Sequence, residues 1–367
     1  MNGNTNCVTL IVEGVATEEV YLGRDWTSSV LSNKISLLNS SGRTHCIALA
    51  NPPFDPPEVT AKQPIHRLLQ KLAVDHVEAG GDATKVASVA AEIRNGIPVQ
   101  VLLVNEADAS SRLAHKCAEK NIKHISIGCI DTPVNIVTGG SLNQITIRER
   151  IQMRRTALCE RWILDDVVHA PETATAVAVV SPKASSLASL VFSSCKRGRK
   201  YFRPTTQLRP RMMLTFAHQA TDLVCNFYSL LSLAASANFV VCNLSEDAPE
   251  APRYAIQVLQ QLRMKSLSGT VSAVVTLGRR GAVVADWYRG GRIHSLTFRP
   301  HSNSAIVPTP TGSGDWLLGS MIIFNHTWAS RNLLNDPVIA STLRAMHFVC
   351  DKLGLARNSY MIDVARV

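Results

Sequence analysis

One glycine-rich segment near the C-terminal end holds a carboxylate where a phosphoryl group could be transferred. The segment reads T-G-S-G-D over residues 311–315, and a strongly apolar run follows it directly. Glycines let backbone N–H groups approach a ligand, and a helix that starts here adds its partial positive end at the same place. Asp315 could then accept a proton from a hydroxyl while Gly312, Ser313 and Gly314 donate N–H groups to a phosphoryl group. Taken alone, the segment is explained equally well by a glycine-rich helix start with an acidic first turn.

Two further segments follow predicted strands. The sequence G-R-R-G over residues 278–281 comes after an apolar run, where small residues can line a nucleotide site. A plain hairpin turn is the simpler interpretation of that segment. Asn243 and Glu246 follow another apolar run, and an amide and a carboxylate three residues apart could hold hydrated Mg²⁺ and phosphate oxygens. A helix cap of the capping-box type is the alternative for this pair.

A double glycine, Gly80-Gly81, precedes a helix that the spacing predicts to begin near residue 83. Without side chains, these two residues leave room for a ligand beside the start of the helix. An ordinary strand-to-helix turn accounts for them as well.

The elements that must position these segments alternate between apolar strands and amphipathic helices. We predict strands over 7–12, 99–104, 124–127, 175–180, 239–242, 271–276, 283–285 and 293–298, and helices over 86–94, 109–119, 316–324 and 338–352. This alternation predicts an α/β fold with a mainly parallel central sheet and helices on both faces. The length of 367 residues fits one large domain spanning 1–367. Shorter alternating segments from about 15–50 and 130–148 predict a small separate sheet.

In this order the four motifs strongly resemble those of the ribokinase / phosphofructokinase-B (PfkB) family of carbohydrate and nucleoside kinases. That family has a Gly-Gly substrate motif, an N-x-x-E motif, a T-L-G-x-x-G nucleotide loop and a C-terminal G-A-G-D anion hole. The resemblance covers almost the whole chain, and the block over 312–315 is its most specific part. It implies a three-layer, Rossmann-like α/β core with a small β-sheet lid over the substrate. No G-x-x-x-x-G-K-[ST] motif is present to bind ATP by another route.

The resemblance also implies a role for each matched residue in an ATP-dependent kinase. Asp315 would be the general base, and the N–H groups of Gly312, Ser313 and Gly314 would stabilise the γ-phosphoryl group. The nucleotide and its Mg²⁺ would contact Asn243, Glu246, Thr276, Gly278 and Gly281, with Glu246 acting on the metal through water. The acceptor would lie against Gly80, Gly81, Lys85 and Glu19. A homodimer formed through the lid is the assembly compatible with this resemblance.

The acceptor half departs from the family pattern more than the phosphoryl half does. Lys85 stands where the family commonly has an asparagine that touches the sugar, and Glu18 and Glu19 stand near the usual substrate-binding aspartate. We interpret Lys85 as favouring an acceptor that carries an anionic group. Thr309 replaces an aspartate that helps to hold a monovalent cation in many members, so the resemblance leaves potassium dependence open.

The composition favours a soluble cytoplasmic protein. The first residues have no basic segment ahead of an apolar stretch, which argues against a secretory signal. The uncharged segment over 223–244 carries too many serines and asparagines for a membrane span, so no membrane partner is expected. The nine cysteines form no C-x-x-C pair and are expected to be reduced, with no protein-held structural metal.

Three other functions remain open from the sequence alone. A nucleoside kinase of the same fold cannot be separated from a sugar kinase by these motifs. Loss of catalysis with retained sugar or nucleotide binding would also explain the altered acceptor half. The net charge of +10 and the basic tract over 196–200 raise nucleic acid as a partner, but the chain lacks a recognisable nucleic-acid motif, so that partner is not expected.

Overall fold

The protein is described here by a computed structural model. The described residues are 8–14, 16–22, 58–61, 74–93, 99–107, 112–130, 134–138, 143–149, 174–180, 213–219, 234, 237, 239–244, 250–265, 272–287, 292–301, 313–331 and 337–367. Gly312 and Glu246, two residues of the predicted site, lie outside these ranges.

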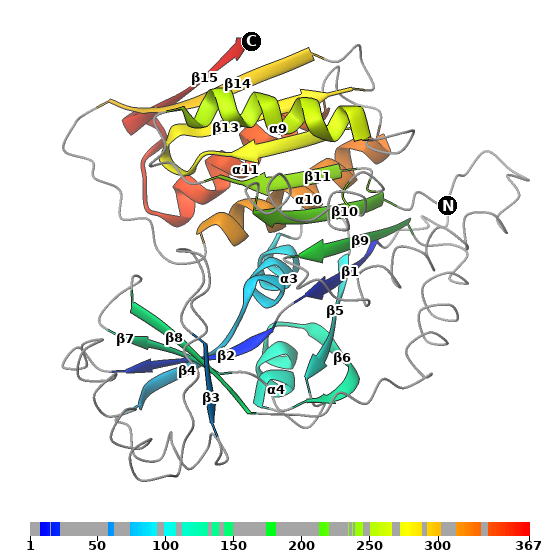
Figure 1. Cartoon of the computed structure of the whole chain (residues 1–367), viewed down its shortest axis with the longest axis vertical. Coiled ribbons are helices and arrows are strands. Elements are labelled where there is room, and N and C mark those ends of the chain that lie inside the picture. The colour runs from blue at the N-terminus through cyan, green and yellow to red at the C-terminus, as the bar shows by residue number, and fades with distance from the viewer. Residues whose placement is uncertain are drawn as a thin grey trace, which may run out of the picture.

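A ten-stranded sheet forms the centre of the molecule, in the order β15-β14-β13-β12-β11-β10-β9-β1-β5-β6 (Figure 1). The strands are β1 (Val8–Gly14), β5 (Val99–Ala107), β6 (Ile122–Ile130), β9 (Ala174–Val180), β10 (Met213–Gln219), β11 (Phe239–Asn243), β12 (Ser272–Thr276), β13 (Gly281–Asp286), β14 (Arg292–Pro300) and β15 (Tyr360–Arg366). The strands from β6 to β12 pair in parallel, and β12 to β15 pair antiparallel.

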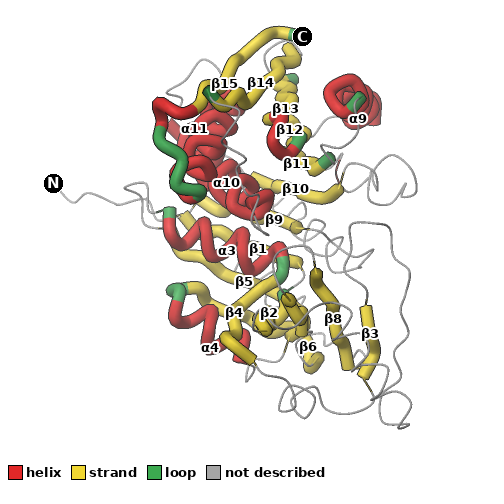
Figure 2. Tube along the Cα trace, turned by 90° about the vertical axis from the view of Figure 1, so that its left-hand side faces the viewer, coloured by secondary structure: helices red, strands yellow, loops and turns green. Residues whose placement is uncertain are grey.

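Helices cover both faces of this sheet (Figure 2). On one face lie α3 (Asp82–Glu92), α4 (Arg112–Glu119), α10 (Ser313–Arg331) and α11 (Pro337–Lys352), and on the other lies α9 (Ala251–Lys265). Two apolar clusters fill the interfaces, one joining the sheet to α3, α10 and α11, the other joining it to α9. Because β12 and β13 are covered on both faces, every residue in them is buried. Strands covered in this way carry continuous apolar runs rather than alternating ones.

A second, five-stranded sheet lies next to the β1–β5–β6 end of the large one (Figure 1). Its order is β3-β8-β7-β2-β4, from β2 (Thr17–Leu22), β3 (Glu58–Ala61), β4 (Val74–Gly80), β7 (Val134–Thr138) and β8 (Asn143–Glu149). The segments expected to form a small sheet, about 15–50 and 130–148, include β2, β7 and most of β8 but neither β3 nor β4. Strand β4 leads directly into α3, so the small sheet and the core share one continuous piece of chain.

The α/β fold with a mainly parallel sheet is confirmed, and all eight predicted strands and four predicted helices overlap observed elements. In the large sheet and its covering helices, three observed elements were not predicted: α9, β10 and β15. The uncharged segment over 223–244 ends in β11, and its part over 223–233 lies outside the described residues. None of the helices in the described part of the chain is long and apolar enough to cross a membrane.

Candidate active site

The helix α10 begins inside the glycine-rich segment. Ser313, Gly314 and Asp315 are its first three residues, so their backbone N–H groups have no partner within the helix. Gly314 is exposed, and no described atom lies within 4 Å of a Cβ built on it. Asp315 is half-buried in the same turn. The start of α10 therefore has the donors, the open space and the carboxylate that the sequence predicted there.

A close helix contact sets the position of Asp315. One turn further along α10, a Cβ on Gly319 would lie 2.8 Å from the backbone oxygen of Val86 and 3.1 Å from Cβ of Val89. Both of those residues belong to α3, so only a glycine allows α10 to approach α3 this closely. The contact brings the first turn of α10 to the first turn of α3, which carries Asp82 and Lys85.

The double glycine forms the junction between β4 and α3. Gly81 has φ 82° and caps the helix, a conformation that glycine adopts without strain. A Cβ on Gly80 would lie 2.1 Å from Cγ of Glu19, so the absent side chain is what leaves room for this glutamate. Glu19 belongs to β2, which pairs antiparallel with β4. The junction therefore holds a carboxylate of the small sheet against the start of α3.

Lys85 and Glu19 form an ion pair at this junction. Nζ of Lys85 lies 2.7 Å from Oε1 of Glu19, with 18% of the lysine side chain and 2% of the glutamate side chain exposed. Burial alone would lower the pKa of Lys85, but Glu19, Asp315 and Asp82 outweigh that effect and raise the pKa above its ordinary value. Lys85 is therefore a charged ammonium group surrounded by carboxylates.

Asp315, unlike Lys85, lies in an environment that disfavours its charged form. Burial raises its pKa well above the usual value for an aspartate, and the negative charge of Asp82 adds to this effect. Lys85 acts against both and lowers the pKa, while Glu19 raises it. A carboxylate with a raised pKa is a stronger base than an ordinary aspartate, as proton abstraction from a hydroxyl requires.

The nucleotide motifs meet at the carboxyl ends of two paired strands. Asn243 ends β11 and is in register with Thr276, which ends β12. Oγ1 of Thr276 lies 3.2 Å from Oδ1 of Asn243 and 3.3 Å from the backbone oxygen of Cys242, and its one proton is shared between these acceptors. The N–H of Leu244 donates to the backbone oxygen of Thr276 at 2.9 Å. Asn243 is exposed, so its amide is accessible beyond the strand end.

The turn after β12 is a hairpin, as the simpler interpretation of the G-R-R-G sequence predicted. A short 3₁₀ helix over Gly278–Arg280 joins β12 to the antiparallel β13, and the N–H of Leu277 donates to the backbone oxygen of Gly281 at 2.8 Å. At Gly281, φ is 108°, and a Cβ would lie 1.9 Å from the backbone oxygen of Leu296. The hairpin interpretation does not exclude a nucleotide role, because the turn also borders a pocket.

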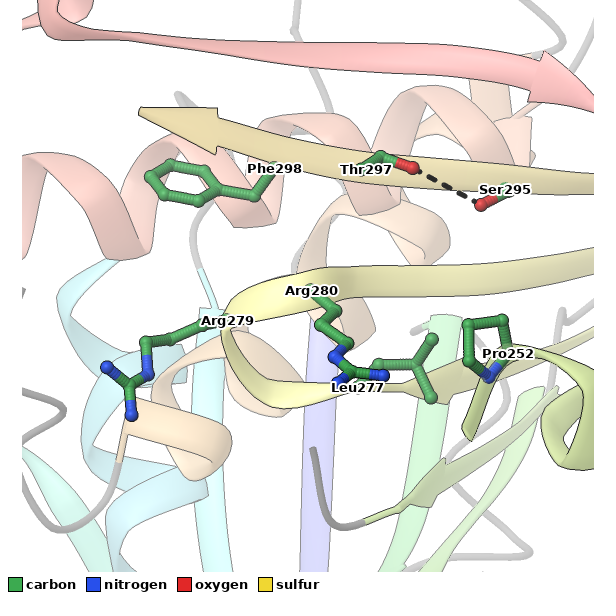
Figure 3. Close-up of a pocket in the computed structure, with 7 residues that line it drawn as sticks. All are labelled: Pro252, Leu277, Arg279, Arg280, Ser295, Thr297 and Phe298. Carbon is green, nitrogen blue, oxygen red and sulfur yellow. Dashed lines mark hydrogen bonds between the residues drawn. The ribbon is translucent and has the colours of Figure 1, made fainter. Parts of the chain in front are cut away.

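This pocket has a volume of about 580 Å³ and lies between the hairpin turn, the start of α9 and β14 (Figure 3). Arg280 lies beside Leu277 in the pocket wall, whereas Arg279 extends to the other side of the turn (Figure 3). The other lining residues are Pro252, Ser295, Thr297 and Phe298. None of these four was predicted from the sequence. Ser295, Thr297 and Phe298 reach the pocket through the pairing of β13 with β14, and Pro252 through the position of α9.

The structure therefore groups the described site residues into two sets. Asp315, Ser313 and Gly314 lie with the acceptor-side residues Gly80, Gly81, Lys85 and Glu19, while Asn243, Thr276, Gly278 and Gly281 lie together at the ends of β11 and β12. Asp82 belongs to the first set and was missed. Its position directly after Gly80-Gly81, in an acidic first helical turn, is the signal that could have identified it.

No protein-family profile matches the sequence, and no curated protein is significantly similar to it. Solved structures are similar over nearly the whole chain. A putative phosphofructokinase from Staphylococcus aureus has a TM-score of 0.55 at 13% identity, covering 98% of this chain and 99% of that one. Ribokinase from Giardia lamblia has a TM-score of 0.58 at 12% identity, covering 95% and 92%. Adenosine kinase from Trypanosoma brucei brucei has a TM-score of 0.56 at 12% identity, covering 94% and 98%.

Proposed function

The chain has the ribokinase-like fold, and from its site we propose that it transfers the γ-phosphoryl group of ATP to a hydroxyl of a small sugar or sugar derivative. The observation that carries this proposal is the environment of Asp315. A carboxylate with a raised pKa stands in the first turn of α10, beside free N–H donors and open space. The similar solved structures include a putative phosphofructokinase, a ribokinase and an adenosine kinase, which supports the proposal independently of the site.

In the proposed reaction, Asp315 accepts the proton of the attacking hydroxyl. The N–H groups of Ser313 and Gly314 donate to the phosphoryl oxygens, and Gly312, outside the described residues, stays a predicted third donor. Phosphoryl transfer requires mainly positioning and charge stabilisation from a protein, so these few groups are sufficient for the chemistry. The half-buried position of Asp315 limits the access of water, which would otherwise accept the phosphoryl group.

The nucleotide would bind along the ends of β11 and β12. Thr276, Gly278 and Gly281 would border ATP, and Arg279 and Arg280 provide two cations beside the same turn. The amide oxygen of Asn243 has a second lone pair beyond the one facing Thr276, which fits hydrated Mg²⁺. Glu246, outside the described residues, stays a predicted second contact of the metal. Bound Mg²⁺ would neutralise charge on the phosphate oxygens.

A nucleoside kinase is the second candidate function. The similarity to the Trypanosoma adenosine kinase, at a TM-score equal to that of the sugar-kinase structures within a few hundredths, favours it. Sugar and nucleoside acceptors present the same kind of hydroxyl to Asp315, so the base and the phosphoryl site are common to both candidates.

The decisive experiment measures ADP release from ATP and Mg²⁺ over a panel of sugars, sugar phosphates and nucleosides. With the acceptor so identified, Asp315→Asn should lower kcat by about 10²–10⁴-fold, the usual scale for a general base. Asp363→Asn is the matched control, because Asp363 pairs with Arg299 at the β14–β15 edge and should leave kcat unchanged. Full activity in Asp315→Asn would contradict the assignment of the base. Ligand-induced thermal shifts without ADP formation for any acceptor would indicate a binding protein instead.

Thermal stability gives an independent measurement on the same variant. Because the pKa of Asp315 is raised in the folded state, folding favours its protonated form. Stability should then fall as pH rises from the ordinary aspartate range through this raised pKa. Asp315→Asn removes that loss, so its Tm should exceed the wild-type Tm at pH 8, and the difference should shrink as pH falls. A variant less stable than wild type at pH 8 would contradict the environment described for Asp315.

A further inference from the structure

Resting on the proposed function, we propose that the Glu19–Lys85 ion pair selects an acceptor without negative charge, a neutral polyhydroxyl compound, and discriminates against sugar phosphates and sugar acids. The sequence alone suggested the reverse, because a lysine in the acceptor site was interpreted as a partner for an anionic group. The contact at 2.7 Å between Lys85 and Glu19 argues against that interpretation.

The ammonium group of Lys85 is already neutralised. An anionic acceptor would have to compete with the almost fully buried Glu19 carboxylate for the Lys85 ammonium group. Removing one partner from a buried ion pair is strongly unfavourable. A hydroxyl group makes no such demand, since an ammonium has three N–H donors and the ion pair leaves others for a neutral oxygen.

The charges around the pair are mainly negative. Lys85 lies within electrostatic range of Glu19, Asp315 and Asp82, so the described acceptor site holds three carboxylates and one ammonium group. A protonated Asp315 would leave two carboxylates against one ammonium group. An added phosphate or carboxylate is repelled in both states, whereas carboxylate oxygens accept hydrogen bonds from neutral hydroxyls.

The pair cannot easily rearrange to expose its cation. The Glu19 side chain lies across the backbone of Gly80, where even a Cβ would come within 2.1 Å of its Cγ. Glu19 is fixed on β2 by pairing with β4, and Lys85 is fixed on α3 by the helix bond from its N–H to the backbone oxygen of Gly81. The backbone positions of both residues are therefore fixed before an acceptor binds.

A purely structural ion pair that ties β2 to α3 is the competing explanation. It predicts lower stability for any variant of the pair, with no change in the preference among acceptors. The measurement that distinguishes the two explanations is the ratio of kcat/KM for neutral and anionic acceptors, because both explanations allow a loss of activity.

The test compares acceptors in matched couples, each a neutral sugar or nucleoside and its phosphorylated or carboxylated derivative. For wild type we expect kcat/KM to favour the neutral member of each couple. Glu19→Gln should shift this ratio towards the anionic member by about tenfold, the scale of one charge-assisted hydrogen bond. Adding Lys85→Gln to Glu19→Gln restores the net charge of the wild-type site and should return the ratio to near its wild-type value. The matched control is Glu92→Gln, which breaks the ion pair with Lys352 at the other end of α3 and should leave the ratio unchanged.

The outcomes separate this inference from the proposed function. A wild-type preference for the anionic members, or a folded Glu19→Gln protein with an unchanged ratio, would overturn the selection by charge while leaving the kinase function intact. If no acceptor is phosphorylated, the proposed function is wrong. Calorimetric binding of the same couples to wild type then decides the inference, with tighter binding of the neutral members supporting it and tighter binding of the anionic members overturning it. Should Glu19→Gln not fold, the wild-type ratio alone gives the same decision.

Discussion

The phosphoryl end and the acceptor end of the site are built in different ways. At the phosphoryl end, backbone groups and short polar side chains stand at strand and helix termini of the large sheet: the ends of β11 and β12 and the start of α10. At the acceptor end, a buried ion pair joins a strand of the small sheet to α3. The first arrangement suits any acceptor because phosphate is common to all reactions of this kind. The second depends on two charged side chains, which can distinguish one acceptor from another.

This difference explains why the motifs match at one end and diverge at the other. Backbone N–H donors depend on glycine and on helix starts, so the sequence that supplies them varies little. A charged pair depends on two side chains from separate elements, and both residues can be replaced together without changing the backbone. Asp315 lies where the two ends meet, since its pKa responds to residues of the acceptor end while it stands in the helix of the phosphoryl end.

Among the variants that test this comparison, the largest effect is expected from moving α10, which carries Asp315, away from α3, which carries Lys85. Gly319→Val places a side chain where a Cβ already lies 2.8 Å from the backbone oxygen of Val86, so α10 must shift away from α3. We expect kcat to fall by about 10²-fold, since a displacement of about 1 Å in the catalytic geometry has that scale. The free energy of unfolding should fall by about 1–3 kcal/mol from overpacking. Steady-state kinetics and urea unfolding check both.

The same helix offers a stability control for that prediction. Gly314→Ala adds a side chain at the start of α10 where no described atom lies within 4 Å, so it should not lower the free energy of unfolding. If Gly319→Val and Gly314→Ala destabilise the protein equally, the close contact between α10 and α3 is not what holds Asp315 in position.

A smaller effect should be confined to the phosphoryl end. Thr276→Val removes the hydroxyl that contacts Asn243 and Cys242, at a cost of about 1 kcal/mol for one hydrogen bond. We expect KM for ATP to rise by about fivefold, with KM for the acceptor unchanged. Thr342→Val is the matched control, because Thr342 is buried and donates to the backbone oxygen of Val338 within α11. A rise in KM for the acceptor instead would contradict the view that the phosphoryl end and the acceptor end act separately.

The smallest expected effect is that of an acceptor-end residue, Lys85, on the pKa of Asp315. Lys85 lowers the pKa of Asp315, so Lys85→Met should raise that pKa further. Since the base must be deprotonated, the acid limb of the kcat/KM profile should move to higher pH. Lys116→Met, which breaks an ion pair with Glu119 on α4, should leave the limb in place. An acid limb that moves to lower pH in Lys85→Met would show that Lys85 does not act on the base.

Much of the large sheet could be predicted from the sequence because its strands are buried on both faces. Runs such as residues 239–242 and 273–275 are apolar throughout, so they can be recognised as strands without any knowledge of their neighbours. The edge strand β15 was missed because most of its residues are partly or fully exposed, and its pairing with β14 holds it in the sheet. Helix α9 does carry a signal, since Ala255, Val258, Leu259 and Leu262 recur at helical spacing and are all buried.

The site divides in the same way. The start of α10 was found from Gly312 to Asp315 because a helix start is a local feature of the chain. The partner of Lys85 could not be found, because Glu19 lies 66 positions earlier in the sequence and reaches it only through the pairing of β2 with β4. Glu19 was named as an acceptor residue, but the sign of its effect depends on that contact. The position of Glu19 in the sequence was enough to name it as an acceptor residue, but its ion pair with Lys85 could be found only from the fold.

A single residue, Gly81, separates β4, an edge strand of the small sheet, from α3, the helix that carries Asp82 and Lys85. Glu19 lies on the small sheet, whereas Asp82, Lys85 and Asp315 lie on helices of the core, so the charges that act on Asp315 come from both parts of the fold. In the proposed reaction, the pair that contacts the acceptor is also the pair whose charges act on the base.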